Sequence, residues 1–416
     1  MQREVTGKKH RLIKVLLTLP LIALVLSLCL SPQLYTGAYG PSFNFMLFSF
    51  VIVHLRIRPR WVDAVLVVLI TAFLATMDFC ISHHPPHIMA YFSFLGMSSL
   101  AIVAVRSIWD GQERRLLLYA WVPAAIFILT GPIAGRMHEW TFKAHPQTLD
   151  LYLLSFDCSL RVQLAFSVGQ YYARHPWLHN PALVAYLAVP IPMALVYTAR
   201  LARFREGAFP SVLAFVLAGP LGFLFYNLFP ACGPLYTFGR AFPFLPFPLA
   251  IVSRLALGPV AIPGRRNAMP SLHLTWTLLP WWYSKGLSWV ERLLALAFLA
   301  LTAVGTLGTG EHWFVDLIVA FPYALMIQAI CAYHLPWKDP RRKTALFLGL
   351  GGILVWIAML RYATELFWMS PIVPWALSAG TIALVLLRQA KLDNAANLGK
   401  LTAAVHNAPA ASPTGE

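Results

Sequence analysis

Charged residues are scarce in this sequence, and their scarcity excludes most classes of soluble protein. Asp, Glu, Lys and Arg make up 12% of the 416 residues, whereas a soluble chain carries about 25%. Hydrophobic residues make up 59%, and the mean hydropathy is +0.66. Because only helices and closed barrels span membranes, and the apolar runs are of helix length, the composition predicts an all-α integral membrane protein.

Cysteine is also scarce, which excludes a disulfide framework and the common zinc modules. The five cysteines show no CxxC spacing, and their number is odd. One bridge, between Cys158 and Cys232, is left open by the sequence. The histidine-rich run 83–87 has no carboxylate or cysteine nearby, so we interpret it as a loop. We expect no metal and no cofactor.

Basic residues are abundant, with 32 Lys and Arg against 16 Asp and Glu. A nucleic-acid-binding protein would gather them into a patch, but here they stand in small groups between apolar runs. With a cytoplasmic N-terminus, 23 of the 32 fall on the cytoplasmic side. We therefore expect no nucleic-acid partner. We expect a multi-pass protein of a plasma membrane, such as the bacterial inner membrane, with both termini cytoplasmic.

Apolar runs of hydrocarbon-spanning length recur along the chain and predict about twelve transmembrane helices. Two of them are short enough to be typical of interfacial or re-entrant segments as well. The first is interpreted as a retained span, because no small-x-small cleavage site follows it. The predicted spans are 12–30, 42–55, 61–81, 88–105, 116–134, 182–200, 209–229, 271–283, 290–308, 312–332, 344–361 and 372–388.

Two segments on the predicted outer side are not spans. Residues 147–177 mix apolar, aromatic and charged side chains, as a helix lying along the outer leaflet would. Residues 230–270 are rich in Pro, Gly and Phe, which predicts a non-helical loop that walls a site. The predicted organisation is an N-terminal transmembrane extension (1–146), a core (147–334), two C-terminal spans (335–393) and a disordered tail (394–416).

Two histidines stand at the outer mouths of predicted helices. His312 and Asp316 are four residues apart, on one face if the run is helical. Ionisable groups are costly at such a position, so the default hypothesis for the pair is function. Pro270 and Ser271 form a helix start that would hold His273 in the first turn. One span separates the two helices, so the histidines are predicted to converge.

The two motifs, MPSLH at 269–273 and HWFVDL at 312–317, together resemble the paired signature of the type 2 phosphatidic acid phosphatase superfamily. Within it the sequence is most similar to the inositol phosphorylceramide synthase branch, whose motifs read approximately MPSLH and HYFVDL. The stretch that begins at Leu149 and Asp150 also resembles the segment preceding the core in that branch. The resemblance covers roughly residues 147 to 334 and implies a six-helix catalytic core.

The resemblance implies a role for each motif residue. His312 would be the nucleophile that forms a phosphohistidine, and Asp316 would orient its ring. His273 would act first as general acid and then as general base. The implied reaction moves a phosphate headgroup, such as phosphoinositol, from a glycerophospholipid to a lipid alcohol, such as ceramide. It would take place at the extracytoplasmic face, with membrane lipids as the only expected partners.

The sequence departs from the superfamily pattern at one position. The phosphatases carry a Lys and an Arg in a first motif and an Arg six residues before the nucleophile, where this chain has Thr306. The sphingolipid synthase branches resemble it in this respect. A cation must still neutralise the transferring phosphoryl group. The expected phosphate-binding residues are Arg265, Arg266, Arg240 and Ser271, and Tyr236 is expected to shape the headgroup pocket.

Alternatives remain open at this point. One is a lipid phosphate or polyprenyl (di)phosphate phosphatase, in which water is the acceptor. Another is a transporter with a non-catalytic motif, although the chain shows no matching half-repeats.

Single residues also have structural alternatives. Arg265 and Arg266 are also typical of interfacial anchors, Glu311 of a helix N-terminal acid, and Asp63 of a buried contact between helices. Tryptophans near span ends, Trp313 among them, are typical of the aromatic belt.

Overall fold

The computed structural model describes residues 40–57, 59–86, 88–111 and 113–406, so the predicted first span lies outside the described residues. Within these residues the regular secondary structure is helical apart from one pair of two-residue strands, which confirms the all-α class. Its elements are α2 (Gly40–Arg56), α3 (Trp61–Ser82), α4 (Ile88–Trp109), α5 (Arg114–Ala144), β1 (Gln147–Thr148), α6 (Asp150–Ser159), α7 (Leu164–Arg174), α8 (Pro176–Leu187), α9 (Pro190–Phe204), η2 (Arg205–Ala208), α10 (Phe209–Leu228), α11 (Pro234–Phe238), η3 (Gly239–Ala241), α12 (Leu249–Val252), β2 (Val260–Ala261), α13 (Leu272–Tyr283), α14 (Trp289–Gly308), α15 (Phe314–Cys331), α16 (Pro340–Tyr362), α17 (Thr364–Trp368) and α18 (Ile372–His406).

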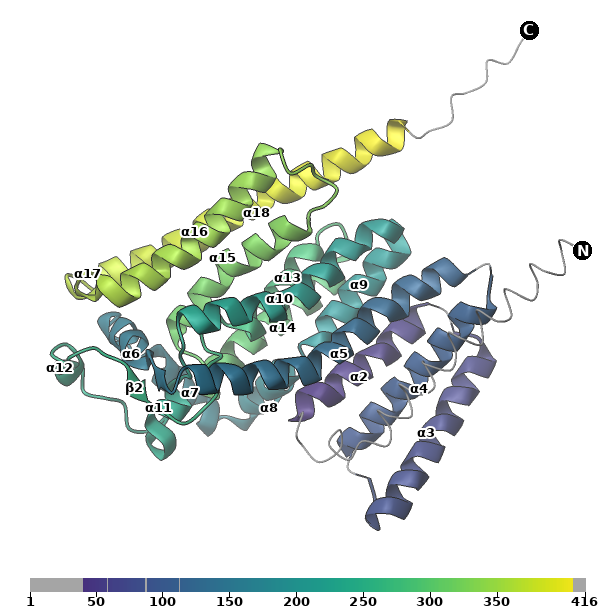
Figure 1. The fold of residues 1–416 in the computed structure, drawn as a ribbon, viewed down its shortest axis with the longest axis horizontal. Helices are drawn as coiled ribbons and strands as arrows, with labels where there is room; N and C mark the ends of the chain where they lie inside the picture. Colours follow the sequence, from purple (N-terminus) through teal and green to yellow (C-terminus); the bar gives the residue numbers. More distant parts are fainter. Residues whose placement is uncertain (1–39, 58, 87, 112, 407–416) are drawn as a thin grey trace, which may run out of the picture.

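The long helices lie side by side in three groups (Figure 1). Helices α2, α3, α4 and α5 form one flank, and α15, α16 and α18 form the other. Helices α9, α10, α13 and α14 lie between the flanks. The short elements α6, α7, α11, α12 and α17 and the strand pair gather at one end of the bundle, at the left of Figure 1. That end holds the segments that the sequence places on the outer side.

Among the described residues, eight helices are long and apolar enough to cross a membrane, or up to ten if each bent pair of helices is one span. The protein is therefore multi-pass, and the predicted number of twelve is not established. The predicted span 182–200 is such a bent pair. Its two helices, α8 and α9, meet at 62°, at the prolines that begin α9.

The outer segment that follows α5 differs from its prediction. Helix α6 does not lie along a surface, because eight of its ten residues are buried. It meets α7 at 86°, and it packs against α15 and α17. The reason lies in its polar residues: Asp150 and Asp157 both accept hydrogen bonds from buried groups at the beginning of α15, so α6 has to enter the protein.

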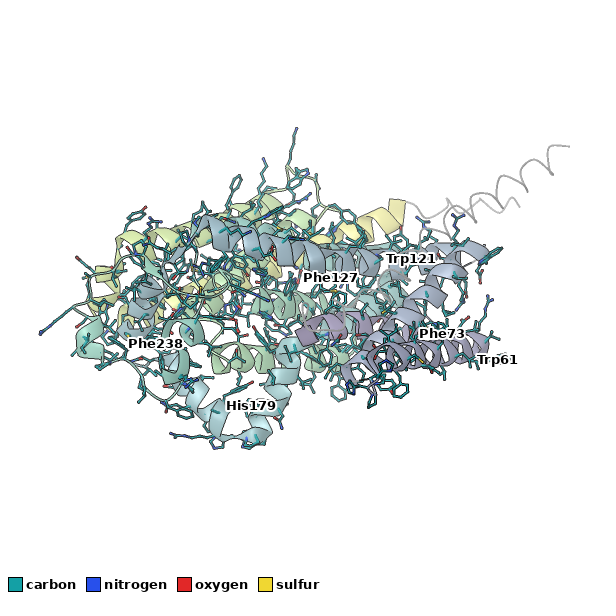
Figure 2. The ribbon with its side chains drawn as sticks, turned by 60° about the horizontal axis from the view of Figure 1, so that its bottom comes forward. Trp61, Phe73, Trp121, Phe127, His179 and Phe238 are labelled. Carbon is teal, nitrogen blue, oxygen red and sulfur yellow. The ribbon has the colours of Figure 1, made fainter. Side chains whose placement is uncertain are left out.

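Helix α3 is the most exposed of the candidate spans, with Trp61 78% and Phe73 62% exposed (Figure 2). Such an apolar surface suits contact with lipid rather than water. Near its beginning, Asp63 accepts a hydrogen bond from Arg106 of α4 at 2.6 Å, and both residues are buried. The prediction that Asp63 makes a buried contact between helices is confirmed.

The structure also bears on a possible disulfide bridge and on where the C-terminal helix ends. Cys158 and Cys232 are both free thiols, so the bridge that the sequence left open does not form. Helix α18 runs to His406, past Asn394, where the sequence predicts the disordered tail to begin. The continuation follows from the many Ala and Leu residues after position 394, which favour helix. Residues 407–416 lie outside the described residues.

A pair of glycines on α16 tests how tightly that helix packs on α15. A Cβ at Gly349 would come within 2.7 Å of the backbone of Met326 and Pro322, whereas nothing lies within 4 Å of one at Gly351. We predict that Gly349→Ala lowers the free energy of unfolding by about 1–3 kcal/mol, because the helices must separate. Gly351→Ala is the matched control and should unfold at or slightly above the wild-type temperature in detergent. Equal midpoints for the two variants would contradict this packing.

Candidate active site

His312 lies in the turn that leads into α15, one residue before the helix cap. The sequence predicts that it shares a helix face with Asp316, but α15 begins only at Phe314, with Trp313 as its N-cap. The reason is the Asp316 carboxylate, which accepts the Trp313 backbone N–H at 2.7 Å and so caps the helix. His312 is brought beside Asp316 by this cap rather than by a helical turn.

The beginning of α15 holds a second carboxylate. Asp157 of α6 accepts the backbone N–H of Phe314 at 3.2 Å. Asp157 and Asp316 are both buried, at 1% and 0% exposure. The positive end of the helix dipole and the otherwise unpaired N–H groups of the first turn stabilise negative charge at this position. The carboxylates beside His312 are therefore held in place by backbone groups.

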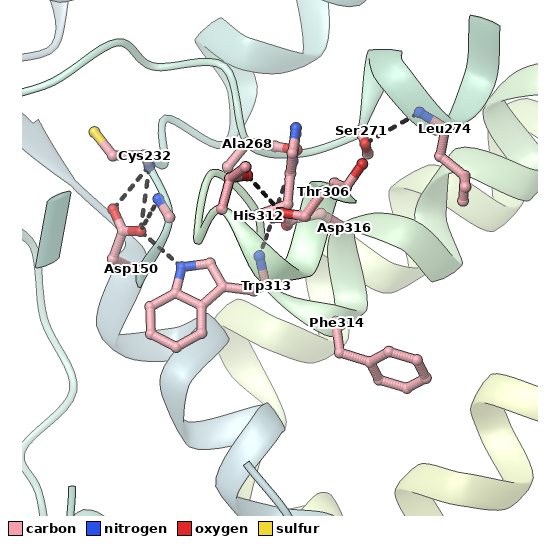
Figure 3. Close-up of polar contacts among 12 residues, drawn as sticks. Asp150, Cys232, Ala268, Ser271, Leu274, Thr306, His312, Trp313, Phe314 and Asp316 are labelled. Carbon is pink, nitrogen blue, oxygen red and sulfur yellow. Dashed lines mark hydrogen bonds and ion pairs between the residues drawn. The ribbon is translucent and has the colours of Figure 1, made fainter. Parts of the chain in front are cut away.

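The hydrogen bonds of His312 define which ring nitrogen is available (Figure 3). Its Nδ1 lies 2.8 Å from the carbonyl oxygen of Ala268 and 3.4 Å from Oδ2 of Asp316. A carbonyl oxygen only accepts, so Nδ1 carries the proton in the neutral ring. The Nε2 atom is buried and has no hydrogen-bond partner among the described residues. The geometry leaves the Nε2 lone pair as the free nucleophilic position of the ring.

His273 faces His312 across the start of α13. The Ser271 hydroxyl accepts the backbone N–H of Leu274, so Ser271 is the N-cap and His273 lies in the first turn, as the sequence predicts. The two imidazole centroids are 6.0 Å apart. The ring of Tyr186, from α8, stacks on His273 at 4.0 Å between centroids. The stacking fixes the plane of the His273 ring, which stands at 72° to that of His312.

Asp150 joins the segments that surround this pair. Its buried carboxylate accepts the backbone N–H of Cys232 at 3.0 Å, that of Gly233 at 2.9 Å and the indole N–H of Trp313 at 2.8 Å (Figure 3). Gly233 has a φ of +117°, and a Cβ there would come within 2.4 Å of the Glu311 carbonyl oxygen. The outer loop can lie this close to the histidine turn only because residue 233 is glycine.

Cys232 stands next to these residues but is not suited to nucleophilic chemistry. Burial raises the pKa of its thiol to about 12, and the negative charge of Asp150 adds to the effect. A thiol with this pKa stays protonated at neutral pH, and the thiolate is the reactive form. The position of Cys232 is therefore structural.

The arginines expected to bind phosphate lie in different surroundings. Arg266 is 1% exposed, and its guanidinium donates to the backbone carbonyls of His145, Pro146 and Ile262 at 2.8, 2.8 and 2.9 Å, and to that of Gly264. It anchors the outer loop to the end of α5, so the expected phosphate contact does not fit its geometry. The closeness of Arg266 to His273 in the sequence suggests a phosphate ligand, but it carries no information about such carbonyl contacts.

Arg265, the next residue towards the N-terminus, is exposed. The preceding residue, Gly264, packs against the ring of Tyr236. Burial raises the pKa of the Tyr236 hydroxyl, the carboxylate of Glu311 raises it further, and the charge of Arg265 opposes both. Arg265 also acts electrostatically on Tyr186, which covers His273. Its charge therefore acts on two tyrosines that lie next to the histidine pair.

The remaining predicted residues are placed as follows. Tyr236 donates its hydroxyl hydrogen bond to the Glu311 carboxylate at 3.1 Å. Glu311 precedes His312 and lies before α15 begins, so it is not the helix N-terminal acid that the sequence favours. Arg240 is exposed on η3, and Ser271 is buried with its hydroxyl serving the α13 cap. At the position where the superfamily's phosphatases have arginine, Thr306 is buried and donates to the Thr302 carbonyl of its own helix at 2.6 Å.

Five groups near the histidines are not predicted from the sequence. The sequence predicts an aromatic-belt position for Trp313, yet it is 1% exposed and bonded to Asp150. Tyr186 gave no signal, because aromatic residues are frequent in every span. The Ala268 carbonyl is a backbone group that no side-chain pattern reveals. The carboxylates of α6 offered one usable signal, since Asp150 and Asp157 are acidic residues in an otherwise apolar segment.

The fold and the site define a polytopic helical membrane protein with a buried histidine–carboxylate pair at one end of its bundle. Residues 151–330 match the family model of the PAP2 superfamily, the type 2 phosphatidic acid phosphatases, and so support the superfamily that the two histidine motifs resemble. Members of that superfamily are phosphatases or phosphotransferases, so the match supports an enzyme of lipid phosphate chemistry. Comparisons with curated proteins and with solved structures gave no match.

Replacing Asp150 tests whether its carboxylate holds the site together. In Asp150→Asn one acceptor is lost and an N–H group faces the N–H donors, so we predict a loss of about 3 kcal/mol in the free energy of unfolding. Glu139→Gln is the control, because Glu139 is 58% exposed in a surface ion pair, and such pairs contribute less than about 1 kcal/mol. Thermal unfolding of both variants in detergent measures the difference. Wild-type stability of Asp150→Asn would show that the three contacts matter little.

Proposed function

We propose that this protein is a lipid phosphotransferase that passes a phosphate headgroup from a glycerophospholipid to a lipid alcohol through a phosphohistidine at His312. The observation that supports the proposal most is the buried His312 ring, with Nδ1 bonded to the Ala268 carbonyl and beside Asp316, and Nε2 without a partner. A ring held in this tautomer presents a lone pair, and a second histidine stands 6.0 Å away for proton transfer.

In the first half-reaction the Nε2 lone pair of His312 forms a bond to phosphorus, and the bond from phosphorus to the diacylglycerol oxygen breaks. His273 gives its proton to that oxygen. The phosphorylated ring keeps its Nδ1 proton and becomes cationic. The carboxylate of Asp316, 3.4 Å from Nδ1, stabilises this cation.

In the second half-reaction the hydroxyl of the acceptor attacks phosphorus and gives its proton to His273, while the N–P bond breaks. The ring of His312 returns to its neutral state. A phosphatase would carry out the same sequence with water. His312 is 1% exposed, which limits the access of bulk water to the phosphohistidine.

The finer parts of the proposal rest on the sequence. Thr306, in place of the arginine that the phosphatases carry, supports the similarity to the inositol phosphorylceramide synthase branch. That similarity suggests phosphoinositol as the headgroup and ceramide as the acceptor. The distribution of basic residues supports an extracytoplasmic site with both termini cytoplasmic.

The histidine pair can be tested with phosphatidylinositol carrying a radiolabelled phosphate and with ceramide as acceptor. We predict that His312→Ala and His273→Ala each lower the rate at least about a thousandfold, because nucleophile and proton donor are separately required. His84→Ala is the control, since His84 is exposed in a loop outside the matched segment, and it should retain full activity. Turnover that persists in His312→Ala would refute the mechanism. Inorganic phosphate as the sole product, with ceramide present, would favour the phosphatase.

The two exposed arginines of the outer loop give a second test. We predict that Arg265→Gln lowers kcat/KM about a hundredfold, because it removes the cation that we propose to neutralise the transferring phosphoryl group. Arg240→Gln should change it by less than about threefold, because Arg265, and not Arg240, acts electrostatically on Tyr186 and Tyr236 beside the histidines. Initial rates over a range of phosphatidylinositol concentrations measure both. The reverse order of effects would move the phosphate site towards η3.

A further inference from the structure

A cavity with polar and charged residues in its wall lies at the end of α15 opposite to His312. It encloses about 40 Å³, more than one water molecule requires. Four helices meet there, namely the last turns of α9, α13 and α15 and the middle of α18. Its walls are formed by polar and charged side chains, chiefly Arg200, Trp282, Lys285, Gln328 and Asp393.

The cavity carries an excess of positive charge. Lys285 pairs with Asp393 at 2.9 Å. Arg200 is 8% exposed, and its guanidinium donates to two backbone carbonyls, those of Tyr283 at 2.9 Å and Gly207 at 3.2 Å. Carbonyl oxygens carry no net charge, and Asp393, the carboxylate that acts electrostatically on Arg200, already pairs with Lys285, so two cations share one carboxylate. A buried cation that lacks a counter-charge is costly unless an anion accompanies it.

Unused hydrogen-bonding atoms line the same cavity. The Nε atom of Arg200 and the indole nitrogen of Trp282 have no hydrogen-bond partner among the described residues. Both are N–H donors. Trp282 is 2% exposed, so its N–H does not reach bulk solvent. The amide nitrogen of Gln328 donates to Asp393 at 2.8 Å, and its oxygen is left as an unused acceptor.

We propose that this cavity binds a phosphate group, either the headgroup phosphate of an anionic phospholipid or free inorganic phosphate. Two N–H donors and a net positive charge fit the oxygens of a phosphate, and arginine is well suited to bind it. The Gln328 oxygen accepts from a hydroxyl of the headgroup or of the phosphate itself. The site is separated from the histidine pair by the length of α15, and the inference does not rest on the proposed function.

The experiment uses the full chain in detergent and follows thermal unfolding by far-UV circular dichroism at constant ionic strength. Three probes are titrated, namely inorganic phosphate, short-chain phosphatidylglycerol, and dioctanoylglycerol as the lipid without phosphate. We expect a saturable rise of the midpoint with at least one phosphate probe and none with dioctanoylglycerol. A rise with phosphatidylglycerol alone identifies a lipid headgroup, and a rise with inorganic phosphate identifies a site open to the free anion.

Matched variants locate the binding. Trp282→Phe keeps one aromatic ring and removes the indole N–H together with part of the ring system, so the apparent Kd should rise about tenfold. Trp289→Phe is the control, because Trp289 is 74% exposed outside the cavity, and it should bind as the wild type does. His312→Ala should also bind normally, which separates this site from the histidine pair.

Three results would overturn the inference: no stabilisation by either phosphate probe, identical affinities in Trp282→Phe and Trp289→Phe, or loss of binding in His312→Ala. Lys285→Ala gives a second measurement if Trp282→Phe does not fold, because Lys285 is 43% exposed and its loss is tolerable. It removes a positive charge from the cavity wall and should also weaken binding.

Discussion

The buried carboxylate of Asp150 is the interaction on which the geometry of the site depends. It accepts N–H groups from the outer loop at Cys232 and Gly233 and from the side chain of Trp313, next to His312. In the loop segment that Asp150 holds, the Ala231 carbonyl accepts a hydrogen bond from the backbone N–H of Ala268 at 3.1 Å. The Ala268 carbonyl in turn accepts from His312. Hydrogen bonds and short backbone segments thus connect Asp150 to His312 by two routes. One runs through Trp313, and the other runs through Cys232, Ala231 and Ala268.

This path explains how the ring of His312 is buried with its Nε2 atom left unpaired, as the proposed mechanism requires. Its Nδ1 is engaged by a neutral carbonyl and lies beside a carboxylate, so proton position and orientation are determined together. The Asp316 carboxylate is itself held by the first turn of α15, whose dipole favours negative charge. Preorganised groups of this kind need no rearrangement when charge develops on phosphorus or on the ring.

Much of the fold was predictable from the sequence, because hydrophobic runs of span length and basic loops follow directly from the cost of polar groups in lipid. The histidine motifs were also predictable, since ionisable residues at helix mouths are rare. The α6 segment was mispredicted because amphipathic composition does not distinguish a helix on a surface from one whose carboxylates are satisfied inside the protein. The bent α8–α9 pair and the separate roles of Arg265 and Arg266 depend on tertiary contacts that adjacent positions in sequence do not reveal.

The covalent state of His312 during turnover tests the central claim most directly. The protein would be mixed with phosphatidylinositol carrying a radiolabelled phosphate, quenched in alkali without acceptor, and digested to locate the label. The hydrogen bond at Nδ1 predicts an acid-labile label on Nε2 of His312, which is discharged when a lipid alcohol is added before the quench. Turnover without any labelled histidine, or a label on another residue, would contradict the account.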